Sequence, residues 1–172
     1  MKVPYIPILI DTREQEGHYW RFADYPCAWV VRGTMRVGDY GLYNLPQAIN
    51  IEAKRGGDLI SSMVGKEREK MGRRLTWMSM CDNAWLISDM TADELRDGDY
   101  YSQLKRQSAW GLWMGWHRDF PKVHFSLAGT HAEELCYDAL RMAWRGYLHR
   151  HADVRRNDRA WKKAMDKSAV TS

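Results

Sequence analysis

The sequence of 172 residues predicts an α/β sandwich in which helices flank a mixed central sheet. Short apolar runs bounded by turn residues alternate with longer stretches of helical periodicity. Two early strands are separated by a loop without helical pattern, which favours a hairpin, whereas helices separate the later strands. The length suffices for one domain with its own core and hardly for two.

The first strand is expected at residues 6–10, an apolar run that ends at Asp11. A run without polar positions is typical of a buried strand, so Asp11 should emerge where that strand reaches the sheet edge. Residues 15–27 are polar with scattered aromatic side chains and predict a loop with a short helix. Two further strands are expected at residues 29–31 and 35–37, and the second leads to an acidic segment.

Residues 49–54, with the sequence INIEAK, alternate in polarity as a half-buried strand does. Side chains two apart on a strand share a face, so Glu52 and Lys54 should point the same way and Ala53 into the opposite layer. A loop separates this strand from Asp39. If that loop folds back as a hairpin, Asp39 comes to lie beside Glu52.

The pairing of Asp39 with Glu52 predicts a site for a divalent metal ion. Two carboxylates at one place repel each other unless a cation lies between them. Mg²⁺ prefers such a partial carboxylate cage, completed by water and phosphate oxygens, and Mn²⁺ takes similar ligands. The ammonium group of Lys54 can hold or activate an attacking water, or offset negative charge at a phosphodiester.

A helix is expected over residues 59–80, after a turn that ends at Asp58. Asp58 has two interpretations that the sequence leaves open, as the N-cap of this helix or as a group beside the metal. The apolar positions fit core packing at helical spacing and are Met63, Met71, Leu75 and Met78. The basic positions are Lys66, Arg68, Lys70, Arg73 and Arg74. Of these, Lys66, Arg68 and Arg73 are expected to contact the DNA backbone, together with Arg55 from the preceding turn. The alternative is that these basic side chains only face the solvent.

The middle of the chain predicts two more buried strands, at residues 84–88 and 123–127. Thr91 to Glu94 has the pattern of a capping box, which starts a short helix in an acidic stretch. A helix over residues 103–118 carries three tryptophans at three-residue steps, Trp110, Trp113 and Trp116. Such a stripe can stack on unpaired bases. Burial in a core or a dimer seam is the expected role.

The C-terminal part predicts an amphipathic helix followed by a basic tail. A second capping-box pattern runs from Thr130 to Glu133, and an apolar stripe follows: Leu135, Cys136, Ala139, Leu140, Ala143, Trp144 and Tyr147. The formal net charge of the chain is +4, and the basic surplus is concentrated after residue 140. Tail residues expected on DNA are Arg155, Arg156, Arg159, Lys162 and Lys163. Residues 1–150 are therefore assigned to the domain and 151–172 to a basic helical extension.

Composition excludes several classes of protein. Three cysteines lie far apart with no CxxC pair, which favours a reduced, intracellular and cytoplasmic protein. No apolar run is long enough to cross a bilayer, and the N-terminus does not begin a signal peptide, so no membrane partner is expected. The histidines lack zinc-ligand spacing, and no Ser-His-Asp arrangement or Gly-rich phosphate loop is present.

Two blocks of the sequence resemble a known nuclease family. Gly38-Asp39, then Ile51-Glu52-Ala53-Lys54, then Asp58 are similar to the G-D…E-R-K-x-x-x-D signature of XPF-type nucleases, which belong to the PD-(D/E)xK group. Residues 10–14, IDTRE, resemble the V-D-x-R-E block of that family. Ala53 departs from the pattern, because the family has arginine there. The resemblance covers about residues 5–145 and lacks the family's tandem helix-hairpin-helix domain.

This resemblance implies a restriction-endonuclease-like sandwich and a Mg²⁺- or Mn²⁺-dependent DNA endonuclease. It implies that Asp39 and Glu52 bind the metal, together with the backbone carbonyl of Ala53. Lys54 would orient the water, and Asp11 would complete or support the metal site. The remaining supporting residues would be Arg13, Glu14 and Asp58. Branched, flapped or forked DNA is the implied substrate.

Two alternatives stay open. One is a DNA-binding subunit with a vestigial nuclease site, although decayed sites usually lose one of the residues at 39, 52 and 54. The other is a Holliday-junction resolvase or a restriction-type nuclease on the same fold. The resemblance also implies a homodimer through the C-terminal sheet edge and helix, and a resolvase needs two sites. So compact a module would suit a phage or mobile-element enzyme.

Overall fold

Six strands form one mixed sheet in the computed structural model, which describes residues 5–14, 20–25, 27–98 and 104–169, with residues 106 and 153–169 by their backbone alone. The strands are β1 (Ile6–Asp11), β2 (Ala28–Gly33), β3 (Tyr40–Leu42), β4 (Asn50–Lys54), β5 (Ala84–Ser88) and β6 (Val123–Leu127). Their spatial order is β2-β1-β3-β4-β5-β6. β3 is antiparallel to both of its neighbours, and the other pairs are parallel. The predicted mixed sheet is confirmed.

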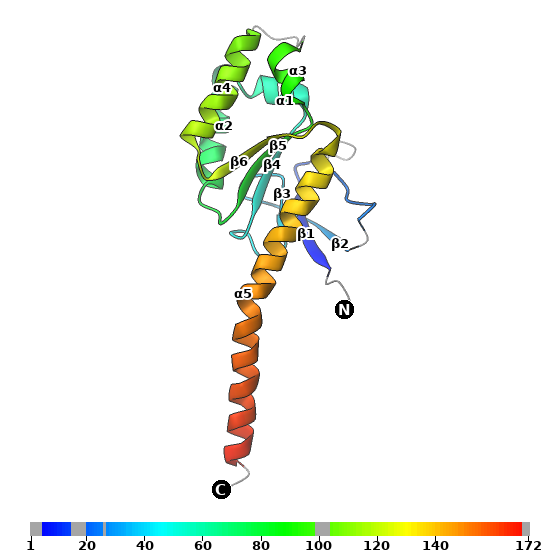
Figure 1. Cartoon of the computed structure of the whole chain (residues 1–172), viewed down its shortest axis with the longest axis vertical. Coiled ribbons are helices and arrows are strands. Elements are labelled where there is room, and N and C mark those ends of the chain that lie inside the picture. The colour runs from blue at the N-terminus through cyan, green and yellow to red at the C-terminus, as the bar shows by residue number, and fades with distance from the viewer. Residues whose placement is uncertain (1–4, 15–19, 26, 99–103, 170–172) are drawn as a thin grey trace.

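Helices cover both faces of the sheet. They are α1 (Gly56–Ser61), α2 (Gly65–Met78), α3 (Ala92–Asp97), α4 (Arg106–Asp119) and α5 (Ala132–Ala169), with a 3₁₀ turn at Gly129–His131. One core lies between α5 and the sheet, where Ile8, Ile10 and Ile51 pack with Leu140. A second core joins α1–α4 to β5 and β6. Figure 1 shows α5 crossing the sheet and continuing past it to Ala169.

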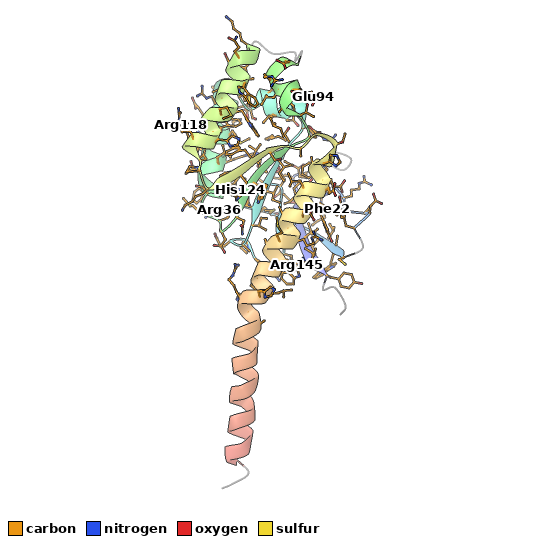
Figure 2. The ribbon with its side chains drawn as sticks, in the orientation of Figure 1. Phe22, Arg36, Glu94, Arg118, His124 and Arg145 are labelled. Carbon is orange, nitrogen blue, oxygen red and sulfur yellow. The ribbon has the colours of Figure 1, made fainter. Side chains whose placement is uncertain are left out.

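The loop between β1 and β2 also packs into the core between α5 and the sheet. Phe22 is buried there, and its backbone N–H donates to Oε1 of Glu133 on α5 at 2.7 Å. Figure 2 shows Phe22 beside α5. Since β4 alternates, Ala53 packs toward this core and Glu52 lies on the other face, beneath α2. The face that carries α2 is therefore the one that holds the predicted site.

Several predicted elements are confirmed. The tryptophan stripe is buried in the second core, where Trp113 and Trp116 are 3% and 5% exposed and Trp110 packs against them. The capping box of α3 is present, because the amide of Glu94 donates to Oγ1 of Thr91 and the amide of Thr91 donates to Oε2 of Glu94. The backbone of the basic tail continues α5 without a break to Ala169.

The strand predicted at residues 35–37 is absent from the structure, where those residues form a loop. Side chains take its backbone hydrogen bonds. The amide of Met35 donates to Oδ2 of Asp11 at 2.6 Å, and its carbonyl accepts from Nη2 of Arg13 at 2.9 Å. The carbonyl of Val37 accepts from Nδ2 of Asn50 at 2.6 Å. β3 therefore begins only at Tyr40.

The single helix predicted at residues 59–80 is two helices. Val64 is extended and Gly65 has a φ of +49°, a left-handed conformation that glycine adopts readily and that ends helical propagation. The first helix starts before Asp58, since the amide of Leu59 donates to the carbonyl of Arg55 at 2.8 Å. The N-cap is Arg55, so the N-cap interpretation of Asp58 is wrong.

Two predictions near the C-terminus are also corrected. β6 is an edge strand in which only Val123 is fully buried, because it has β5 on one side alone. Thr130 lies inside the 3₁₀ turn that precedes α5, and the Glu133 carboxylate accepts a hydrogen bond from the Phe22 amide instead of closing a capping box.

The helix expected within residues 15–27 falls partly outside the described residues. No helix in the described part of the chain is long and apolar enough to cross a membrane.

Candidate active site

Asp39 is placed by a glycine turn. Gly38 has a φ of +77°, and a Cβ built there would lie 2.2 Å from Oδ1 of Asn50. Only glycine fits both the left-handed backbone and this close approach. The turn directs the next residue, Asp39, to the start of β3, where its amide donates to the carbonyl of Ile51 at 2.8 Å.

Pairing of β3 with β4 brings Asp39 beside Glu52. Tyr40 lies opposite Ile51 in the antiparallel register, so the residue before Tyr40 lies opposite the residue after Ile51. Opposed residues share a face, which is here the α2 face. The amide of Ala53 donates to Oδ2 of Asp39 at 2.7 Å and fixes its carboxylate. The predicted hairpin and its acidic pair are thus formed.

Glu52 lies at the centre of the site and is fully buried. Its Oε1 pairs with Nζ of Lys54 at 3.0 Å and with Nη1 of Arg74. Its Oε2 is buried and has no hydrogen-bond partner among the described residues. A buried carboxylate oxygen without a partner is costly, so the chemistry of the site favours a further cation or donor at this atom.

A third carboxylate, that of Glu14, lies close to this pair. Burial raises the pKa of Asp39 well above its usual value, and the negative charges of Glu52 and Glu14 raise it further. The hydrogen bond from the Ala53 amide and the positive charge of Lys54 lower this pKa, but by less. Burial also raises the pKa of Glu14, together with the charge of Glu52. Carboxylates with raised pKa values in one cluster are typical of a site that a metal ion neutralises when it binds.

Asp11 has a different environment. It is 1% exposed, and both of its oxygens are occupied. Oδ1 accepts from the amide and Nε of Arg13 at 2.8 and 2.7 Å, and Oδ2 accepts from Nη2 of Arg13 and from the amide of Met35. Burial opposes ionisation of Asp11, but these hydrogen bonds hold its pKa below the usual value. Asp11 therefore positions the chain on either side of the site, the segment of Glu14 and that of Met35.

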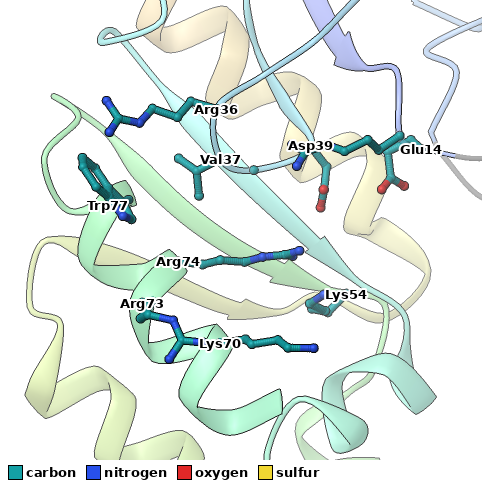
Figure 3. A pocket seen from close by; sticks show the side chains of 11 residues that line it. Glu14, Arg36, Val37, Asp39, Lys54, Lys70, Arg73, Arg74 and Trp77 are labelled. Carbon is teal, nitrogen blue, oxygen red and sulfur yellow. The ribbon is translucent and has the colours of Figure 1, made fainter. Parts of the chain in front are cut away.

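The acidic cluster opens into a cavity of about 670 Å³. Figure 3 shows Glu14, Asp39, Lys54 and Arg74 pointing toward a common space at one end of it, with Arg36 and Trp77 at the other end. The basic residues that line the cavity are Arg13, Arg36, Lys54, Lys70, Arg73 and Arg74, against two acidic residues, Glu14 and Asp39. This excess of positive charge suits a polyanion.

Other predicted residues lie outside this cavity. Asp58, Arg55, Lys66 and Arg68 are exposed and do not line it, and their roles beside the metal or on DNA stay predictions. The side chains of Arg155, Arg156, Arg159, Lys162 and Lys163 lie outside the described residues.

Lys70 and Arg74 were predicted only as two of the five basic positions of this stretch and were not distinguished as site residues, and Trp77 was missed. Lys70, Arg74 and Trp77 of α2 are spaced by four and three residues, so they share a helix face beside the buried stripe of Met71, Leu75 and Met78. That spacing was a usable signal. Arg36 had no such signal, because its loop conformation depends on side-chain bonds from distant segments.

The residues present fit a divalent metal ion. No group of three or more His, Cys, Asp or Glu side chains in the described part of the chain is arranged to hold a metal ion. Mg²⁺ does not require such a group, since it keeps several waters and commonly uses one or two carboxylates. Asp39 and Glu52, with the unpartnered Oε2, supply that set of donors.

Comparisons with known proteins agree with this fold. No protein-family model matches the chain, and no curated protein matches it. A solved structure of XPF from Aeropyrum pernix is similar, with a TM-score of 0.59 and 12% identity over 78% of this chain. XPF from Aeropyrum pernix in complex with DNA is similar with a TM-score of 0.58 and 13% identity over 81% of this chain. The chain has an XPF-like fold. It spans 65% of the length of each of those two chains.

The XPF-like fold confirms the predicted fold class, an α/β sandwich with a mixed sheet between helices. At 12% and 13% identity the likeness is one of fold alone. The role of each site residue in this XPF-like fold therefore rests on the geometry described above.

Proposed function

We propose that this chain is a DNA endonuclease that depends on Mg²⁺ or Mn²⁺ and hydrolyses phosphodiester bonds. The observation that carries the proposal is the fully buried Glu52 carboxylate, which pairs with Lys54 next to a cavity that is lined by Asp39 and Lys54 and has a basic rim. The XPF-like fold supports it, and one of the similar XPF structures is a complex with DNA. Branched, flapped or forked DNA is the proposed substrate class.

Each residue has a proposed role. Asp39 and Glu52 would hold the metal ion with the backbone carbonyl of Ala53. When bound, the ion supplies Lewis-acid polarisation of the phosphate and lowers the pKa of water. Lys54 holds the attacking water through its ammonium group and offsets negative charge near the phosphate. Asp11 supports the site by bonding Arg13 and Met35.

The basic rim would bind the sugar–phosphate backbone. Arg74 also pairs with Glu52, and the Glu52 charge raises the pKa of Arg74. Because Lys and Arg contacts to phosphate release counterions, binding should weaken as salt rises. Rim contacts alone do not distinguish sequences, so specificity for DNA structure must come from the shape of the substrate.

The test is a cleavage assay with labelled single strand, duplex, flap, fork and four-way junction, with Mg²⁺, with Mn²⁺ or with chelator. Glu52→Gln and Asp39→Asn keep shape and remove charge, so each should lower the cleavage rate at least about 100-fold while DNA binding is retained. Glu69→Gln removes an exposed carboxylate from the same helix as Arg74 and serves as the matched control, with an unchanged rate.

Cleavage that survives the chelator or the Glu52 substitution contradicts the mechanism. DNA binding without cleavage of any substrate would favour the DNA-binding subunit. Preferential cutting of the four-way junction by a protein of twice the chain mass would favour a Holliday-junction resolvase. Analytical ultracentrifugation supplies that mass and tests the proposed homodimer through β6 and α5.

A further inference from the structure

A second cavity, of about 480 Å³, adjoins the catalytic one. Arg36, Val37 and Trp77 line both cavities and therefore form the wall between them. The guanidinium carbon of Arg36 lies 3.9 Å from the centroid of the Trp77 ring, as a cation–π pair. Figure 3 shows these two side chains together at the end of the catalytic cavity away from Glu14.

The lining of the second cavity differs from that of the first. It is largely apolar and includes Met35, Leu42, Pro46 and Met80, with the amide side chain of Gln47. Trp77 and Met80 remain exposed, at 44% and 62%. An aromatic ring, thioethers and a few polar groups make a surface that accepts a flat heteroaromatic group and not a phosphate.

Asn50 also lines this cavity, but its amide group is directed elsewhere. The residue is 3% exposed, its Nδ2 donates to the carbonyl of Val37, and its Oδ1 is packed toward Gly38. The inference about the ligand therefore rests on the aromatic and apolar lining, which suits the flat ring of a nucleobase.

We propose that the second cavity is a subsite for one unpaired nucleobase of the DNA strand whose phosphate occupies the catalytic cavity. This inference rests on the proposed function for the position of the phosphate. The base enters beside Trp77, and the Trp77–Arg36 wall supplies its stacking surface. A sugar alone separates a base from its phosphate, so two cavities that share a wall suit the two ends of one nucleotide. A paired base is already stacked in a duplex and does not reach this subsite.

The test is equilibrium binding by fluorescence anisotropy in chelator, where no cutting occurs. Trp77→Ala should bind single strand and forked DNA about tenfold more weakly and duplex about as tightly as the wild type. Trp77→Phe should restore most of the affinity. Trp29→Ala, which removes an indole of similar exposure on β2, should change nothing.

An abasic nucleotide sharpens the assay. Removing one base at the bound position of a forked oligonucleotide should weaken binding to the wild type and leave binding to Trp77→Ala unchanged, because the two changes remove the same contact. The subsite is overturned if Trp77→Ala binds single strand like the wild type, or if it loses single strand and duplex equally. If base-dependent binding holds but no substrate is cut, the nuclease proposal fails and the subsite stands.

Discussion

At the scale of single residues, the site depends on groups that never face its cavity. Asp11 takes four hydrogen bonds from Arg13 and Met35, so it ties the end of β1 to the loop that leads to Asp39. The sequence pattern indicates that Asp11 belongs to the site. It does not distinguish a metal ligand from a residue that holds the site together, because both are acidic residues at a strand end.

Asp11→Asn should reduce the free energy of unfolding by about 2 kcal/mol at pH 7, since buried donors lose a charged acceptor. The usual pKa of an aspartate is 3.8, and folding lowers the pKa of Asp11 below it. The ionised form of Asp11 therefore contributes stability at pH values above 3.8. The difference between wild type and variant should therefore narrow as the pH falls below 3.8 and through the lowered pKa. Urea unfolding measures it, with Asp82→Asn, at an exposed position, as the control. Equal stability at pH 7 would contradict the positioning role.

Gly38→Ala should reduce the free energy of unfolding by at least about 2 kcal/mol, from its left-handed φ and from displacement of Asn50. It should also lower cleavage, because the turn places Asp39. Gly57→Ala is the matched control, since a Cβ there meets nothing within 4 Å and an alanine in helix α1 should stabilise by about 0.5–1 kcal/mol. Thermal unfolding and cleavage measure both. Similar losses from the two variants would refute the assignment of strain to Gly38.

At the scale of elements, α2 supplies one wall of the cavity. Lys70 and Arg73 line the cavity from one face of this helix, and Lys70 pairs with Glu67 on the same helix. DNA affinity falls as salt rises, so a plot of log affinity against log salt has a negative slope. If both residues contact phosphate, the double variant Lys70→Ala, Arg73→Ala should make this slope less steep by about 1.5. Titrations at several salt concentrations measure the slope. Lys122→Ala with Arg145→Ala removes two exposed charges away from the cavity and should leave it unchanged.

The elements also show what the sequence could predict. The alternation of residues 49–54 was enough to place Glu52 and Lys54 on one face, and the structure pairs them at 3.0 Å. The hairpin followed from the absence of helical pattern before it. The loop at residues 35–37 could not be predicted, since its backbone bonds go to side chains of Asp11, Arg13 and Asn50. Local pattern decides which face a residue occupies, whereas long-range bonds decide where a strand stops.

At the scale of the whole molecule, the structure has two hydrophobic cores, one between α5 and the sheet and one that joins α1–α4 to β5 and β6. The α5 core packs the hydrophobic face of β1, β3 and β4, and the opposite face carries the acidic cluster beneath α2. Apolar packing is thus confined to the α5 face in this part of the sheet, and the buried charge of Glu52 lies on the other face. The wall between the two cavities lies on that face as well, where Arg36 contacts the ring of Trp77.

The tail is the last part of this arrangement. Helix α5 contributes Cys136, Ala139, Leu140 and Ala143 to the core and then continues to Ala169. Truncation after residue 151 should therefore leave the unfolding temperature nearly unchanged. It should weaken DNA binding and lower the salt slope by at least about 1, because positive charge is lost.

A second variant separates charge from helix. Glutamine is a good helix former without charge, so replacing Arg155, Arg156, Arg159, Lys162 and Lys163 with Gln should keep helicity by circular dichroism and reproduce the loss of affinity. Binding that weakens on truncation but not in the glutamine variant would show that the length of the tail acts, and not its charge. Unchanged binding in both would end the role of the tail in holding DNA.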